Sequence, residues 1–182
     1  MTIHSITRRV ALGIAIAGGF GGSLVHAQTT DKATAAPKSA IASSDVKWVE
    51  KAARAGMAEV EAGKLAAAQA KRDDVRAFGK EMIADHGKAN DELKGIATQK
   101  GITLPDKTDS KHLKALTKLS GLSGDKFDKQ YLKTAGLDDH TDAQKLFKDG
   151  AKDLKDPDLK AFAQKTLPTV EHHLQMVKDM KK

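Results

Sequence analysis

The sequence predicts an all-α protein, and three observations lead to this fold class. Alanine and lysine are abundant and aromatic residues make up only 4% of the 182 residues, which suits helix interiors. Four prolines and few β-branched runs leave little material for a sheet. Apolar residues recur at steps of three and four over long stretches, which is the period of a helix with one buried face.

Residues 1–27 are predicted to be a signal peptide and are set apart from the fold. Two arginines precede an apolar run over 10–24, and Val-His-Ala at 25–27 has the small-x-small pattern of a cleavage site. The mature chain is expected to begin at Gln28 in the periplasm, through either Sec or twin-arginine export. The run is too short and too rich in glycine for a good membrane span, so we expect no integral span after cleavage.

Residues 28–44 are predicted to form a disordered linker of small and polar residues, followed by one folded domain over 45–182. Removal of the leader takes away two basic residues and no acidic ones, which lowers the net charge from +7 to +5. The lysines are spread along every segment, without an arginine cluster or interleaved aromatic residues. We therefore expect solvated helix faces and no nucleic-acid partner.

The first two of four long helical patterns cover residues 45–71 and 73–101. Alanine and glycine dominate the stripe of the first, so a neighbouring helix can approach closely; its members are Val46, Val49, Ala53, Gly56, Val60, Gly63 and Ala67. The second begins at an Asp-Asp cap, ends at Gly101, and has the apolar face Phe78, Met82, Ala89, Leu93 and Ile96. A turn of two or three residues makes the two helices antiparallel neighbours.

The third pattern covers about 125–154, with bends expected at Gly136 and Gly150. The fourth begins with an Asp156 N-cap and a proline at the first helical position. About 24 residues join the second helix to the third, and residues 109–120 within them predict a short extra helix. Two short hairpins joined by one long crossover is the ferritin-like form of a four-helix bundle, although an up-down-up-down bundle with a folded loop at one end also fits.

Each long helix carries one candidate for a polar core residue near its middle. Glu59 and His86 lie 13 and 14 residues from the first hairpin turn, and His140 and His173 lie about 15 and 18 residues from the second. The three histidines fall on apolar stripes, whereas Glu59 lies at the edge of its stripe. Because a bundle aligns the midpoints of its helices, these four residues are expected to share one layer.

If the four helices align as expected, two interpretations of this layer remain open. Imidazole and carboxylate groups from facing helices form a common site for one divalent transition metal ion, Zn²⁺, Cu²⁺, Mn²⁺ or Fe²⁺. Alternatively, the histidines are only hydrogen-bonded, with Asp85, Asp139 and Glu171 as nearby acceptors.

Motifs on three helices, in order, carry a resemblance to a known family. They are Phe78-x3-Met82-x2-Asp85-His86-x2-Ala89-Asn90-x2-Leu93, then Phe127-Asp128-x2-Tyr131-Leu132 with His140, then Leu159-x2-Phe162-Ala163 and Leu167-Pro168 with His173. Over about residues 45–180 the chain resembles the bacterial domain-of-unknown-function family 4142. The resemblance implies a ferritin-like bundle exported to the periplasm or the outer envelope, and it brings no established activity.

Three classes of function follow from these residues. The first is a periplasmic bundle that binds a metal, and the second is a non-catalytic envelope or stress protein whose histidines are structural. The third is a metal-dependent oxidase, which is disfavoured because Ile83, Leu137 and Val170 stand where Glu-x-x-His of a di-iron site would need glutamate. We identify no nucleophilic triad, phosphate loop or nucleotide motif, so the sequence favours a non-enzymatic protein over an enzyme without deciding between them.

Overall fold

The computed structural model describes residues 40–182, and within this range the chain is helical and carries no strand. The all-α prediction is therefore confirmed. The predicted signal peptide, and all of the predicted linker before residue 40, lie outside the described residues. The elements are α1 (Ser43–Gln69), α2 (Asp73–Lys100), α3 (Ser110–Ser120), α4 (Gly124–Tyr131), the π-helix η1 (Leu132–Asp139), α5 (His140–Asp153) and α6 (Pro157–Met180).

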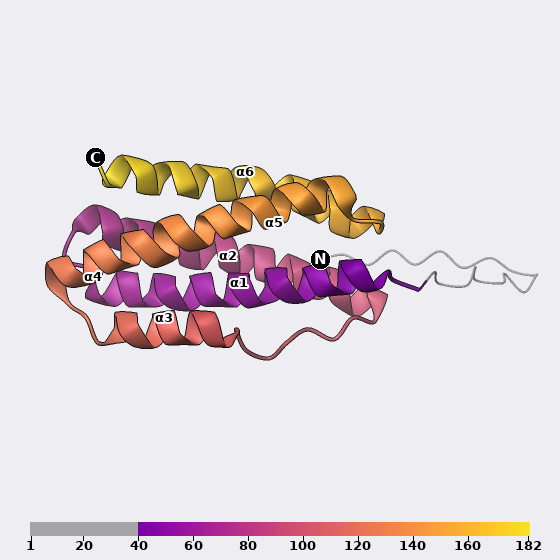
Figure 1. The fold of residues 1–182 in the computed structure, drawn as a ribbon, viewed down its shortest axis with the longest axis horizontal. Coiled ribbons are helices and arrows are strands. Elements are labelled where there is room, and N and C mark those ends of the chain that lie inside the picture. The colour runs from indigo at the N-terminus through magenta and orange to yellow at the C-terminus, as the bar shows by residue number, and fades with distance from the viewer. Residues whose placement is uncertain (1–39) are drawn as a thin grey trace, which may run out of the picture. The chain divides into compact units, whose positions relative to one another are not determined.

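Helices α1 and α2 form an antiparallel hairpin with a very close contact (Figure 1). A Cβ atom added to Gly79 of α2 would lie 2.7 Å from the Cβ of Ala66 and 2.8 Å from the carbonyl oxygen of Gly63 on α1. The turn between the helices is held by Asp128 of α4, whose carboxylate accepts from the backbone N–H groups of Lys71 and Arg72 at 3.0 and 2.9 Å. The small residues of α1 thus permit the close approach that their spacing predicts.

The third long segment is a continuous run of α4, η1 and α5, and it forms a second hairpin with α6 (Figure 1). The sequence predicts an α-helix with bends here, and the structure instead has eight π-helical residues that end just before His140. Gly136 lies in this π-helix, and a Cβ atom added to it would be 2.9 Å from the side chain of Val177 on α6. A wide helical turn and a missing side chain together let η1 and α6 pack closely.

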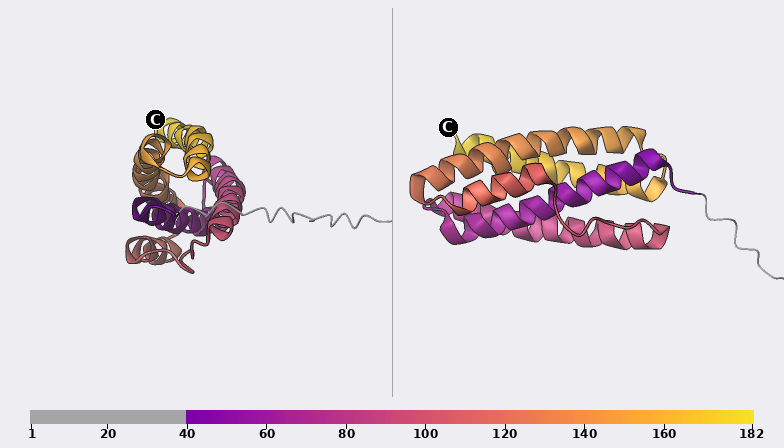
Figure 2. Two further views of the ribbon diagram at one scale, coloured as in Figure 1. Left: turned by 90° about the vertical axis from the view of Figure 1, so that its right-hand side faces the viewer. Right: turned by 60° about the horizontal axis from the view of Figure 1, so that its bottom comes forward.

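The connector between the two hairpins runs back along α1. Helix α2 ends and α4 begins at opposite ends of the molecule in Figure 1, and the end-on view in Figure 2 shows α3 outside the other helices, beside α1. Arg54 of α1 fixes the approach to α3, because its Nη1 donates to the Lys107 carbonyl at 3.0 Å and its own carbonyl accepts from Thr108 Oγ1 at 2.9 Å. The connector therefore runs along the length of the helical domain.

Two apolar clusters fill the interior, on either side of a polar layer. One cluster is centred on Trp48, which packs edge-on against Phe147 and Phe162. The other holds Phe78 and Tyr131. Glu59, His86, His140 and His173 are buried at chain positions between the members of these two clusters.

The buried face of α1 is broader than the stripe that the sequence predicts. Glu59, predicted at the edge, is only 4% exposed, whereas Val60 and Ala67 are half-buried. Ala62 and Ala66 belong to the buried face instead. Helix α1 is covered by α2 on one side and by α3 and the third segment on others, so a stripe fitted to one neighbour underestimates its burial.

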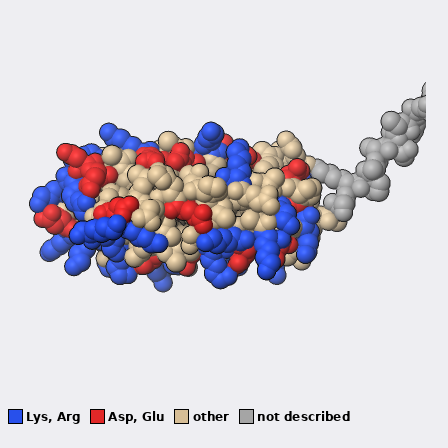
Figure 3. Space-filling view, turned by 90° about the horizontal axis from the view of Figure 1, so that it is seen from above, with Lys and Arg blue, Asp and Glu red and all other residues tan. Residues whose placement is uncertain are grey.

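The outer surface carries charges of both signs. On the face seen in Figure 3, basic and acidic side chains lie interspersed along the helices. Among the described residues, 40–182, no helix combines the length and the apolar character that crossing a bilayer requires.

Candidate metal centre

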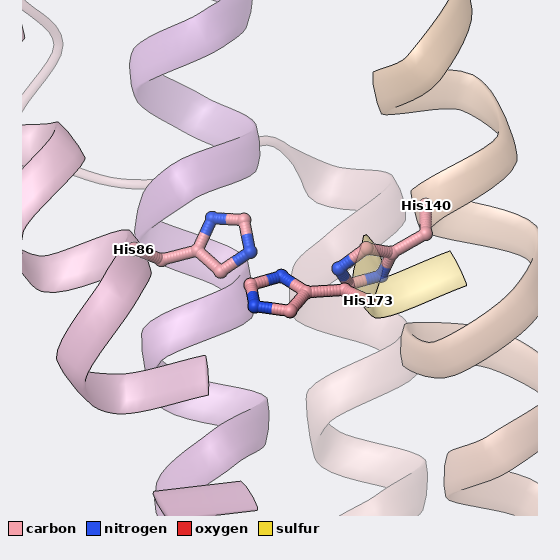
Figure 4. Close-up of side chains that lie close together, drawn as sticks. All are labelled: His86, His140 and His173. Carbon is pink, nitrogen blue, oxygen red and sulfur yellow. The ribbon is translucent and has the colours of Figure 1, made fainter. Parts of the chain in front are cut away.

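The imidazole rings of His86, His140 and His173 meet in the centre of the helices. Their ring centroids are 5.4 to 5.5 Å apart in each pair. Each ring offers one nitrogen, and the three nitrogens lie within 4.8 Å of one another. Figure 4 shows these nitrogens turned toward a common space from three different helices. We call these three residues the histidine triad.

The helices fix the position of each ring. His86 stands one turn after Met82 on the buried face of α2, and His173 stands one turn before Val177 on α6. His140 is the first residue of α5, directly after the π-helix. Its backbone N–H donates to the Leu137 carbonyl, and its ring Nδ1–H donates to the Ala135 carbonyl at 2.7 Å. The π-helix thus supplies the carbonyl that orients the ring.

The outward hydrogen bonds determine which nitrogens carry protons. A carbonyl oxygen can only accept, so Nδ1 of His140 is protonated and its Nε2 holds a lone pair when the ring is neutral. His173 places Nε2 3.0 Å from Asp85 Oδ2, so this nitrogen is the donor and Nδ1 holds the lone pair. The inward nitrogens of these two rings are therefore electron-pair donors.

The inward nitrogens have no hydrogen-bond partner among residues 40–182. They are Nε2 of His86, Nε2 of His140 and Nδ1 of His173, and all three are buried. A buried polar atom without a partner costs about 1–3 kcal/mol. The purely hydrogen-bonded interpretation of the layer needs an acceptor or donor at each of these atoms, and the described part of the chain offers none.

Burial also keeps the triad neutral. It lowers the pKa of His86 well below the usual value and the pKa of His140 to about 4, and it lowers the pKa of His173 as well. The neighbouring rings add to this effect, because a charge on one disfavours a charge on the next. At neutral pH the lone pairs are therefore available without the loss of a proton.

Glu59 lies beside the triad rather than within it. Its Oε1 is 3.6 Å from His140 Nδ1, the outward nitrogen of that ring, and its Oε2 is buried without a partner in the described range. Burial, followed by the nearby charge of Asp139, raises the pKa of Glu59 well above the usual value. The sequence places Glu59 in the right layer, and the structure sets its carboxyl group on the far side of His140 from the inward nitrogens.

Of the three acceptors proposed from the sequence, one contacts a histidine of the triad and two have other partners. Asp85 is the partner of His173, whereas Glu171 instead accepts from Gln144 and pairs with Lys148. Asp139 pairs with Lys111 at 3.4 Å and lies 3.9 Å from His112.

The structure holds a second group of ligand-type side chains that the apolar stripes do not predict. Glu81, Asp85 and His173 also bring one ligand atom each within 4.8 Å of one another. Glu81 stands four residues before Asp85 on α2, and this spacing is the sign in the sequence that the two carboxylates share one helix face.

Comparison with known proteins adds a family and a fold. The family model described as "Domain of unknown function (DUF4142)" matches residues 30–180. The crystal structure of a DUF305 fragment from Deinococcus radiodurans is similar, with a TM-score of 0.68 and 11% sequence identity over 77% of this chain and 96% of that chain. At this identity the likeness concerns the fold alone. No curated protein matches the chain.

Proposed function

We propose a metal-binding function for this chain, which belongs to the DUF4142 family of proteins of unknown function. In this proposal the histidine triad holds one divalent transition metal ion through Nε2 of His86, Nε2 of His140 and Nδ1 of His173. Imidazole nitrogen suits Zn²⁺, Cu²⁺ and Fe²⁺, and the three residues leave a coordination position for a further ligand.

One observation carries the proposal. Two rings of the triad are held from outside, by the Ala135 carbonyl and the Asp85 carboxylate, while their inward nitrogens have no partner among the described residues. Metal-binding histidines commonly donate their other N–H to a carbonyl or carboxylate, which fixes the tautomer and the ring orientation. The same arrangement would be unfavourable in a layer that held no ligand.

Glu59 has a supporting role in this proposal. Its carboxyl group faces the outward nitrogen of His140, where a negative charge would stabilise a positive charge delivered to the triad. Since burial raises its pKa, metal binding would favour release of its proton. A shift of the side chain would be needed for Glu59 to become a direct ligand.

We further propose that the fold is a ferritin-like four-helix bundle and that the protein is exported to the periplasm. Two antiparallel hairpins joined by a connector that crosses the bundle support the first point. The predicted signal peptide over residues 1–27 supports the second. The di-iron chemistry of such bundles is not proposed, because Ile83, Leu137 and Val170 replace the glutamates that it requires.

The alternative is a non-catalytic envelope or stress protein whose polar layer is structural. Titration of metal-free protein with Zn²⁺, Cu²⁺ and Mn²⁺ in a calorimeter separates the two. Metal binding predicts one saturable site and a melting temperature that rises with metal concentration, because the ion binds the folded state. Absence of saturable binding for all three ions would favour the structural protein.

Two variants assign the binding to the triad. His86→Ala should abolish both the binding heat and the rise in melting temperature. His112→Ala is the matched control, because His112 lies on α3 and pairs with Asp109 at 2.9 Å, outside the triad. Equal loss of binding in both variants would point to nonspecific chelation at the surface.

A further inference from the structure

His86 differs from the other two rings of the histidine triad in its hydrogen bonds. The Ala135 carbonyl holds the outward nitrogen of His140. The Asp85 carboxylate holds that of His173. Neither ring nitrogen of His86 is hydrogen-bonded within residues 40–182, although the residue is only 9% exposed. One ring of the triad therefore lacks the outward acceptor that the other two have.

The outward nitrogen of His86 is Nδ1. Figure 4 shows one nitrogen of this ring directed toward the other two rings and the other nitrogen directed away from them. Nε2 is the enclosed, unpartnered atom, and when it offers its lone pair to a metal ion, Nδ1 carries the proton. The bound form of the triad thus presents an N–H group of His86 that needs an acceptor.

A surface hollow between α2 and α6 adjoins His86. Its volume of about 130 Å³ gives room for several water molecules or one small organic anion. Hydrogen-bond donors line it from both helices: the exposed Lys88 of α2 and the half-buried Thr166 and Thr169 of α6. We call this space the His86 hollow.

The charges around the His86 hollow balance until a metal ion binds. Lys165 Nζ lies 2.9 and 2.8 Å from the two carboxylate oxygens of Glu92, so these two charges compensate each other. Asp85 and Lys88 add one charge of each sign, and Lys88 forms no ion pair within the described part of the chain. A divalent ion on the triad adds two positive charges beside the hollow, which then favours an anion.

We propose that the His86 hollow binds a small carboxylate anion, which accepts a hydrogen bond from Nδ1 of His86. The ammonium group of Lys88 and the hydroxyl groups of Thr166 and Thr169 supply its other contacts. This proposal rests on the metal-binding function proposed above, since the anion completes the orientation of the third ring. A charged acceptor behind a metal-binding imidazole fixes its tautomer and makes it a stronger ligand.

A singly charged anion suits the hollow better than sulfate or phosphate. The carboxylates of Asp85 and Glu92 also line the space and repel a second negative charge. Because the anion and the metal ion stabilise the same arrangement of His86, each should raise the affinity for the other by the same factor.

Zinc affinity in the presence and absence of acetate tests the proposal. Zn²⁺ binding to metal-free protein is measured near neutral pH by competition with a chromophoric chelator, while sodium chloride is replaced by sodium acetate at constant ionic strength. We expect saturating acetate to raise the zinc affinity about 10-fold. Sulfate should give a smaller rise, and a rise as large as that with acetate would overturn the assignment to a carboxylate.

Three variants locate the effect of acetate. Lys88→Gln and Thr169→Val should each reduce the rise in zinc affinity, because each removes a donor from the His86 hollow. Lys80→Gln is the matched control and should keep the full rise, because Lys80 is an exposed lysine of α2 that does not line the hollow. An equal rise in all three variants would refute the proposal, since acetate would then act elsewhere.

Two further results would separate the anion from the metal site. Zinc binding that acetate does not strengthen would refute the anion and leave the triad as a metal site. With Co²⁺ on the triad, a large change in visible absorbance on addition of acetate would make acetate a ligand of the ion and would refute its position behind His86. Wild-type protein that binds neither zinc nor cobalt would refute the proposed function itself.

Discussion

Asp85 holds His173 from the surface side through a hydrogen bond of 3.0 Å, and this bond leaves the other ring nitrogen facing the triad. The carboxylate is 41% exposed and the histidine is fully buried, so the pair lies across the boundary between solvent and core. A comparable bond to the Ala135 carbonyl orients His140 from a backbone atom that no side-chain substitution removes.

This difference makes Asp85 the accessible test of how the triad is oriented. Asp85→Ala should weaken metal binding ~10–100-fold, because the ring of His173 loses the acceptor that fixes its tautomer and orientation. Asp85→Asn should lose less metal affinity, since the amide oxygen can still accept a hydrogen bond from His173 Nε2. Competition titration against a chelator of known affinity measures both, and equal affinities for Ala and Asn variants would show that the hydrogen bond has no such role.

The stability of metal-free protein should fall as the pH drops below ~6.5. Unfolded histidine has a pKa of ~6.5, whereas burial lowers the pKa of His140 to about 4, so between these values the unfolded state binds more protons. The loss from His140 alone is roughly 3 kcal/mol at pH 4, and His86 and His173 shift in the same direction. The free energy of unfolding, measured in urea, should therefore rise as the pH rises across this range.

Glu59 gives the opposite dependence of stability on pH. Its pKa is raised in the folded state, so above ~4.5 the folded protein holds a proton that the unfolded chain releases, and stability falls as the pH rises. Glu59→Gln should remove this fall in stability toward neutral pH. It should keep the loss of stability at acid pH that the histidines cause. If the free energy of unfolding, measured in urea, changes with pH in the same way near neutrality in the wild type and in Glu59→Gln, Glu59 is not buried in its protonated state.

Two glycines of α2 should respond to alanine with opposite signs. Gly79→Ala should destabilise by about 1–3 kcal/mol or more, because the new Cβ would lie 2.7 Å from Ala66 and 2.8 Å from the Gly63 carbonyl. Gly95→Ala meets nothing within 4 Å and should stabilise by about 0.5–1 kcal/mol through helix propensity. Chemical denaturation that gives both variants the same sign would rule out the close α1–α2 contact.

The apolar cluster around Trp48 should be sensitive to truncation. Leu93→Ala and Phe147→Ala should each cost ~2–5 kcal/mol, since both side chains are buried and leave cavities. Lys94→Ala, on the exposed side of α2 beside Leu93, should cost less than ~0.5 kcal/mol. Similar losses for Leu93 and Lys94 in urea would mean that the other face of α2 is buried.

The sequence predicts the helices and the layer well, because both follow from periodicity. His86, His140 and His173 stand on apolar stripes, and residues on one stripe share one face wherever the helices are regular. Distance from the turns then places the residues at one level, and the structure brings the three histidines together there.

The π-helix could not be predicted in this way. It lies where the third segment packs against α6, with Gly136 next to Val177, and the local sequence does not predict that contact. The sequence puts Glu59 at the edge of a stripe for a related reason, since α1 has neighbours on several sides and a single stripe describes only one of them. The pairing of Asp85 with His173 depends on the rotation of two helices about their axes, which spacing along one helix does not determine.

The triad takes one residue from the first hairpin and two from the second. An ion bound there would tie α2 to α5 and α6, and so would close a loop of the chain between residues 86 and 173. Closing a long loop removes many conformations from the unfolded chain, as a disulfide does. The sequence contains no cysteine and can form no disulfide, so a bound metal ion would be the cross-link between its two halves.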